Sequence, residues 1–307
     1  MRKTLVFAGK WLWTVLVVAA ISFLLWRSRA DILAMLRQIP AWMLAASLLS
    51  TITAKFLLGE NARIAARRSG INVSYVDANR LYNLSQLGKY LPGSIWQFVG
   101  RAAAYRNQLG ASYAQIRDSL LTESLWIVGA AFAIGMLLCG GSLWQFLSVK
   151  APSTLLWWLG GLLALGALGT SVLLALRRQQ MLRYLKSAVP TPRALLVQAG
   201  VWSLLGLSFW ILARACGMSA GLGFSIGLFA GGFALGFLVP FAPAGLGIRD
   251  AVLTMGLLPF APAGEALAVT VVARFVYLIA ELLVVALQNP LMRAAQRLLS
   301  PADAAER

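Results

Sequence analysis

The stretch ALLVQAGVWSLLGLSFWILA, residues 194–213, has 20 residues without a charge and lies between Arg193 and Arg214. One helix needs about 20 apolar residues to cross the hydrocarbon core of a bilayer. Other apolar stretches of the chain are residues 11–26, 38–54, 124–149, 151–176, 215–248 and 266–290. The sequence therefore predicts an all-α, polytopic integral membrane helix bundle with about 7–8 spans, one or two of which are re-entrant or broken helices.

The overall composition supports a membrane protein. The 307 residues are 60% hydrophobic and only 12% charged, whereas soluble domains are nearer one quarter charged. So few charges cannot cover a soluble globule of this size, but they suit a chain whose solvent is mostly lipid. We expect a single transmembrane domain over residues 1–300, followed by a short cytoplasmic tail at 301–307.

The net charge of +17 does not predict nucleic-acid binding, because no soluble basic domain carries it. Lys and Arg instead concentrate in alternate loops, as the positive-inside rule describes. The bias places the N-terminus inside and requires an even number of crossings, so both termini are expected to be cytoplasmic, in a bacterial inner membrane. Arg27 and Arg29 follow the first apolar stretch in place of a small-residue cleavage site, which indicates an uncleaved first span.

The chain has no histidine and two cysteines, Cys139 and Cys216. This inventory excludes Ser-His-Asp and Cys-His catalysis and argues against zinc. The cysteines fit either a disulfide or two inert thiols, and we expect the thiols. The sequence contains no nucleotide-binding loop, so we expect no cofactor, and a gradient or no energy source for any transport.

Two segments depart from the pattern of simple spans. Residues 81–101, LYNLSQLGKYLPGSIWQFVGR, are broken by Pro92-Gly93, and the second broken segment covers residues 231–260. The first fits a re-entrant pair of half-helices or an amphipathic hairpin. In the second, Pro240, Pro243, Gly245 and Gly247 stop a helix near the internal face, and a short apolar stretch at 251–260 follows. Non-helical backbone at membrane depth is tolerated where it is buried in protein or lines a wet cavity, and transporters build substrate sites from interrupted helices. The alternative is that these breaks only kink a span.

Ionisable residues near these breaks and within spans are the candidate ligands of an anionic headgroup. Arg274 and Glu281 share one helix face, so they pair either with each other or with partners across the bundle. A purely structural ion pair, or basic residues facing the inner leaflet, would explain the same pattern. The candidate substrate-binding residues are Lys89, Pro92, Gly93, Trp96, Arg101, Glu123, Pro243, Gly245, Gly247, Arg249, Asp250, Arg274 and Glu281.

Two motifs give the chain a family resemblance. The sequence GKYLPGSIW at 88–96, followed by Arg101, and PAGLGIRD at 243–250 resemble the two signatures of the lysylphosphatidylglycerol synthase transmembrane-region family. The second signature usually reads Pro-Gly-Gly-Leu-Gly, an apolar residue and Arg-Glu, so Ala244 and Asp250 depart from it. The resemblance extends from Trp11 to about Leu299 and implies a polytopic inner-membrane domain that flips a modified lipid. Because the sequence ends at Arg307, we expect a stand-alone member without the synthase domain.

The sequence is compatible with three functions. The first is a flippase-like lipid transporter that handles an anionic phospholipid or a polyprenyl-linked lipid. The second is a non-transporting membrane partner or scaffold for lipid- or envelope-synthesis enzymes. The third is a membrane-embedded transferase, for which Asp31 is the only carboxylate in the first external loop. We expect the first, and therefore no enzyme.

Overall fold

The structure, a computed structural model, describes residues 37, 39–90, 95–150, 189–238 and 245–299. This part of the chain consists of helices joined by turns and loops, with no strand. Its elements are α3 (Ala41–Arg68), α4 (Tyr75–Gln86), the 3-10 helix η1 (Leu87–Tyr90), α5 (Trp96–Leu109), α6 (Tyr113–Lys150), α9 (Pro192–Ala215), α10 (Leu222–Phe237), α11 (Ile248–Leu257) and α12 (Ala263–Leu299).

Among the described residues, four helical segments are long and apolar enough to cross a membrane: Ala41–Arg68, Tyr113–Gly141, Pro192–Ala215 and Ala263–Gln288. Helix α10 is apolar but shorter. These helices confirm the prediction of an all-α membrane helix bundle. The apolar stretches at 11–26 and 151–176 lie outside the described residues.

Helix α3 does not end at the first charged residue after its apolar stretch. Lys55 closes the uncharged stretch 38–54, but α3 continues through it to Arg68, and the Lys55 side chain is fully buried. A charge can lie inside a helix bundle when a partner across the bundle neutralises it, as Glu281 does here.

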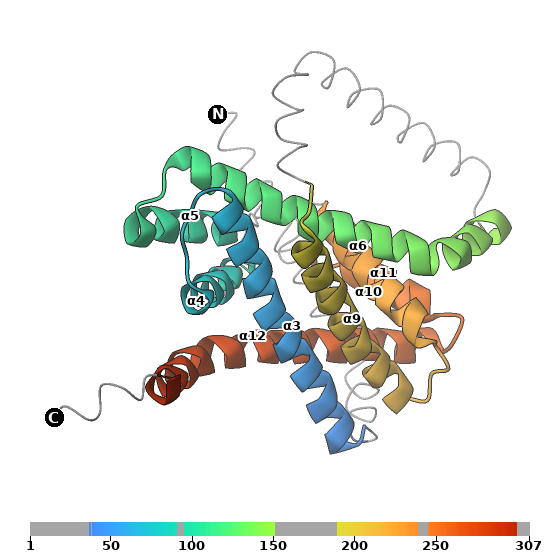
Figure 1. The fold of residues 1–307 in the computed structure, drawn as a ribbon. Coiled ribbons are helices and arrows are strands. Elements are labelled where there is room, and N and C mark those ends of the chain that lie inside the picture. The colour runs from blue at the N-terminus through green and yellow to red at the C-terminus, as the bar shows by residue number, and fades with distance from the viewer. Residues whose placement is uncertain (1–36, 38, 91–94, 151–188, 239–244, 300–307) are drawn as a thin grey trace, which may run out of the picture.

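Helices α3 and α9 run side by side, while α6 and α12 cross them, as Figure 1 shows. Hydroxyl groups join the α3–α9 pair: Ser47 Oγ lies 2.7 Å from Ser208 Oγ, and Thr51 Oγ1 donates to the same atom at 2.8 Å. Ser50 Oγ donates to the Leu204 carbonyl at 2.7 Å. Small polar residues allow close helix approach and add interhelical hydrogen bonds where lipid offers no hydrophobic driving force between helices.

Helix α6 approaches α10 through glycines. A Cβ atom at Gly135 would lie 2.9 Å from the Gly231 Cα and 3.0 Å from its nitrogen, closer than side chains normally come to backbone. Gly129, on the same helix, has nothing within 4 Å of such an atom. The close crossing of α6 and α10 therefore requires a residue without a side chain at position 135 but not at position 129.

Gly135→Ala is expected to be less stable than Gly129→Ala by about 1–3 kcal/mol, because overpacking must separate two helix backbones. Both substitutions gain the same helix propensity of roughly 1 kcal/mol, so the difference isolates the contact. Thermal unfolding of both variants in the same mild detergent measures it. Equal unfolding midpoints would contradict the tight crossing.

Helical structure is interrupted in both motif regions. Helix α4 ends at Gln86, η1 ends at Tyr90 and α5 begins at Trp96, while α10 ends at Phe237 and α11 begins at Ile248. A Cβ at Gly88 would lie 2.8 Å from the Gln97 nitrogen, so η1 packs against the start of α5. How these breaks lie relative to the membrane stays a prediction. Cys139 and Cys216 are both free thiols, as expected.

Candidate functional site

A cavity of about 230 Å³ lies at the centre of the described bundle, and each of the eight α-helices contributes to its lining. Much of the wall is apolar, with Trp202, Phe229, Phe233 and Phe237 on one side. The polar part of the wall comes mainly from η1, α5, α6, α11 and α12, the elements that carry or face the two motifs. The cavity therefore offers both an apolar surface and a group of charged side chains.

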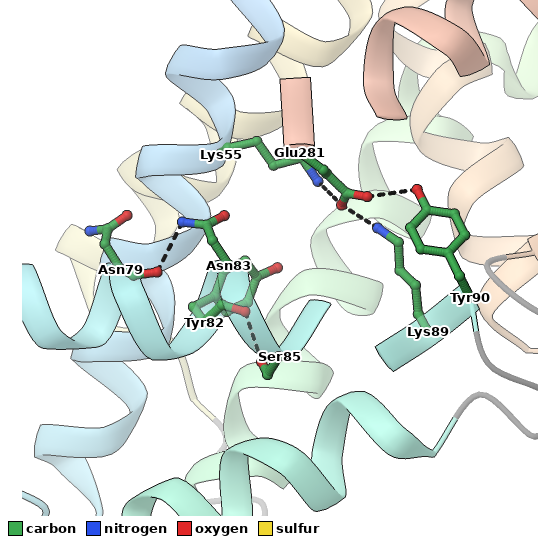
Figure 2. Close-up of polar contacts among 8 residues, drawn as sticks. All are labelled: Lys55, Asn79, Tyr82, Asn83, Ser85, Lys89, Tyr90 and Glu281. Atoms are coloured by element: carbon green, nitrogen blue, oxygen red, sulfur yellow. Dashed lines mark hydrogen bonds and ion pairs between the residues drawn. The ribbon is translucent and has the colours of Figure 1, made fainter. Parts of the chain in front are cut away.

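Behind one wall of the cavity, two lysines share the carboxylate of Glu281 on α12. Lys55 of α3 and Lys89 of η1 both donate to Oε1, and the Tyr90 hydroxyl donates to Oε2 at 2.6 Å. Figure 2 shows these side chains converging on Glu281 from different elements. The Tyr277 ring lies beside both ammonium groups, with its centroid 3.7 Å from Lys55 Nζ and 4.8 Å from Lys89 Nζ.

A second ion pair joins α5 to α6. Arg101 Nη1 lies 2.9 Å from Glu123 Oε1 and 2.8 Å from Oε2, and the two side chains are 1% and 3% exposed. The guanidinium also lies over the Tyr82 ring, at 5.0 Å from its centroid. Both members of the pair line the cavity. Because each would be a costly isolated charge at this depth, the pair ties α5 to α6.

The turn before α11 is built by glycine and closed by Asp250. Gly245 and Gly247 have φ of 69° and 88°, which L side chains rarely adopt. The Gly247 N–H donates to Asp250 Oδ2 at 3.0 Å, and Arg274 of α12 donates to both oxygens of the same carboxylate at 2.5 Å. Asp250 therefore fixes the start of α11 against α12, although it is shorter than the usual Glu.

Arg249 differs from the other cavity cations. Its guanidinium carbon lies 4.3 Å from the Phe229 ring centroid, 5.1 Å from that of Tyr277 and 6.0 Å from that of Phe233. Within the described ranges it has no hydrogen bond or ion pair to a carboxylate, and it lines the cavity at the first turn of α11. The N-terminus of a helix adds unpaired N–H groups and a partial positive charge at this position.

Most of the predicted site residues come together. Those lining the cavity are Lys89, Arg101, Glu123, Gly245, Arg249, Asp250 and Arg274. Glu281 lies behind the wall through Lys89, and Gly247 shapes the turn without lining the cavity. Trp96 is about half exposed and does not line it. Pro92, Gly93 and Pro243 lie outside the described residues.

Sequence reasoning also missed several residues of the site. Lys55 was missed because the apolar stretch was taken to end at residue 54, although the residues on both sides of Lys55 are apolar. Tyr90 stands in the first motif but was not chosen. The aromatic residues Phe229, Phe233 and Tyr277 carried no signal, because aromatic side chains are common in membrane helices.

In the part of the chain that the structure describes, four long apolar helices surround a cavity lined by charged side chains, which is the architecture of a multi-pass helical membrane protein. The family profile described as the lysylphosphatidylglycerol synthase TM region matches residues 11–284, and the chain belongs to this family. The resemblance seen in the two motifs is thus confirmed. No curated protein sequence matches the chain.

Proposed function

We propose that the protein is a flippase-like transporter of the bacterial inner membrane that moves a lipid with an anionic headgroup between the leaflets. The headgroup occupies the central cavity, and no covalent chemistry takes place there. The proposal includes the topology expected from the charge bias: about 7–8 spans with both termini in the cytoplasm. The observation that carries it is Arg249, a cation that lines the cavity, lies beside aromatic rings and has no ion pair with a carboxylate in the described part of the chain.

A cation inside a bilayer protein is costly unless it is paired or faces water. Arg101 and Arg274 are paired with Glu123 and Asp250. Among the described residues Arg249 has no ion pair with a carboxylate, and the aromatic rings beside it stabilise a cation by about 0.5–2 kcal/mol. A phosphate placed against Arg249 and the N-terminus of α11 would supply the missing countercharge through charge-assisted hydrogen bonds.

The interrupted backbone supports the same interpretation. Gly245 lines the cavity and lies in the turn between α10 and α11, where a Cβ at Gly236 would lie 3.4 Å from the Gly245 Cα. Broken helices whose half-helix N-termini point at an anionic group are a recurring way to build substrate sites in transporters. The apolar side chains of α10 that line the cavity would contact the apolar part of the lipid next to its headgroup.

The test is transport of a fluorescent phosphatidylglycerol in proteoliposomes, read as the fraction of label accessible to an external quencher. Arg249→Ala is expected to slow redistribution by about 10–100-fold, because hydrogen bonds to charged groups contribute about 1.5–3 kcal/mol. Arg106→Gln serves as the matched control, since Arg106 is also a basic residue of this region but does not line the cavity. Protein-free liposomes give the background.

Redistribution at the wild-type rate in Arg249→Ala would contradict the role of Arg249. If the wild-type protein moves no anionic lipid and instead co-purifies with a lipid-synthesis enzyme, the scaffold function replaces transport.

A further inference from the structure

The charges around the cavity do not balance. Within the part of the chain that the structure describes, the cavity lining and the Glu281 cluster behind it contain five basic side chains and three carboxylates. The basic residues are Lys55, Lys89, Arg101, Arg249 and Arg274, and the carboxylates are Glu123, Asp250 and Glu281. Each carboxylate already has a basic partner, so two positive charges remain without a protein countercharge.

The two excess charges can be assigned. One is Arg249, which has no carboxylate partner among the described residues. The other belongs to the lysine pair that shares Glu281, because one carboxylate neutralises only one of them. Lys55 is fully buried and does not line the cavity, whereas Lys89 does. The second charge available to a ligand is therefore that of Lys89.

Both available cations lie beside the same aromatic ring. The Tyr277 centroid is 4.8 Å from Lys89 Nζ and 5.1 Å from Arg249 Cζ. They come from the two interrupted regions, η1 and the start of α11, which α12 brings together through Tyr277 and Glu281. Glu281 would stay neutralised by Lys55 and hydrogen-bonded to Tyr90 if the Lys89 ammonium turned towards the cavity (Figure 2).

We propose that the site selects a lipid whose headgroup ends in a phosphate monoester, bound between Arg249 and Lys89. A terminal phosphate carries about −1.5 to −2 charges at neutral pH, which matches the two uncompensated cations. A phosphodiester such as phosphatidylglycerol carries a single charge and leaves one of them unneutralised. This inference rests on the proposed function and names the substrate class of the same site. Phosphatidate and a polyprenyl phosphate share the required chemistry.

The experiment measures binding to the full-length protein in a zwitterionic detergent. The ligands are dioleoyl phosphatidate, dioleoyl phosphatidylglycerol, a short-chain polyprenyl phosphate and inorganic phosphate. Wild type is expected to bind phosphatidate about tenfold more tightly than phosphatidylglycerol, the factor for one additional charge-assisted hydrogen bond. If the polyprenyl phosphate binds at least as tightly as phosphatidate, the ligand is a polyprenyl phosphate. If it binds more weakly than phosphatidate, the ligand is a glycerolipid. Inorganic phosphate is expected to bind weakly.

Lys89→Gln is expected to reduce the ratio of phosphatidate affinity to phosphatidylglycerol affinity to about one, while the phosphatidylglycerol affinity itself changes by less than about twofold. Lys89→Arg should keep the preference, because it keeps the charge. Arg249→Gln should weaken both lipids. Lys89→Gln leaves Glu281 paired with Lys55 and Tyr90, so the fold is expected to persist, and Arg106→Gln is the control for loss of a positive charge elsewhere.

Equal affinity of wild type for the two glycerolipids, or an unchanged preference in Lys89→Gln, would overturn this inference alone. Transport of phosphatidylglycerol could still proceed through Arg249 in that case. If wild type neither binds nor moves any anionic lipid, the proposed function and this inference fall together.

Discussion

Glu281→Gln is expected to lower the free energy of unfolding by about 3–5 kcal/mol, because it removes the negative charge that two buried lysines share. Glutamine keeps the shape of the side chain and one acceptor oxygen, so the loss reports the charge. Lys55 and Lys89 would then face each other as like charges in a low-dielectric interior. Unfolding in mild detergent, followed by circular dichroism at increasing denaturant, measures the change.

Two matched variants make this prediction specific. Lys55→Gln leaves Glu281 with Lys89 and Tyr90, so we expect a smaller loss of about 1–2 kcal/mol. Glu265→Gln removes a carboxylate from the exposed first turn of the same helix and should change stability by less than about 0.5 kcal/mol. Equal losses in Glu281→Gln and Lys55→Gln would show that the cluster is not short of negative charge.

The class of fold could be predicted from sequence because it depends on composition and on span length, both of which a single chain displays. The predicted stretch 194–213 lies within α9 (Pro192–Ala215), whose first turn contains Arg193 and whose last turn contains Arg214. Thr191 caps the helix by accepting from the Ala194 N–H. The start of α6 was missed by about three turns, because its first residues are polar yet helical. An uncharged stretch locates the apolar part of a helix, whereas the helix can extend beyond that stretch at either end.

Pairing across the bundle could not be predicted in the same way. Arg274 and Glu281 share a face of α12, yet Arg274 pairs with Asp250 and Glu281 with Lys55 and Lys89. Which residues meet depends on how far each helix is shifted and rotated against its neighbours. Packing of small residues sets these positions, and a single sequence does not reveal them.

The two interrupted regions are held to the same helix by different means. The first is tied to α12 by Lys89 and Tyr90 at Glu281, and the second by Asp250 at Arg274. Glu281 and Arg274 are two turns apart on α12, so one helix face positions both. A shift of α12 would therefore move both walls of the cavity together.

Arg101→Met is expected to lower the free energy of unfolding by about 3–5 kcal/mol, because Glu123 would remain buried without a countercharge. Glu123→Leu should cost a similar amount, since it isolates Arg101. The double variant Arg101→Met/Glu123→Leu should recover most of the loss, because replacing a whole buried ion pair by apolar residues is often close to neutral. Unfolding of the four proteins in one detergent forms the double-mutant cycle.

The double variant also separates a structural role of Arg101 from a role in ligand binding. If the pair only ties α5 to α6, the double variant regains stability and transports lipid near the wild-type rate. If Arg101 also contacts the headgroup, the double variant is stable but transport stays slow, because the cavity has lost one of its four lining cations. Losses that simply add in the cycle would contradict the buried pair itself, since independent residues show no coupling energy.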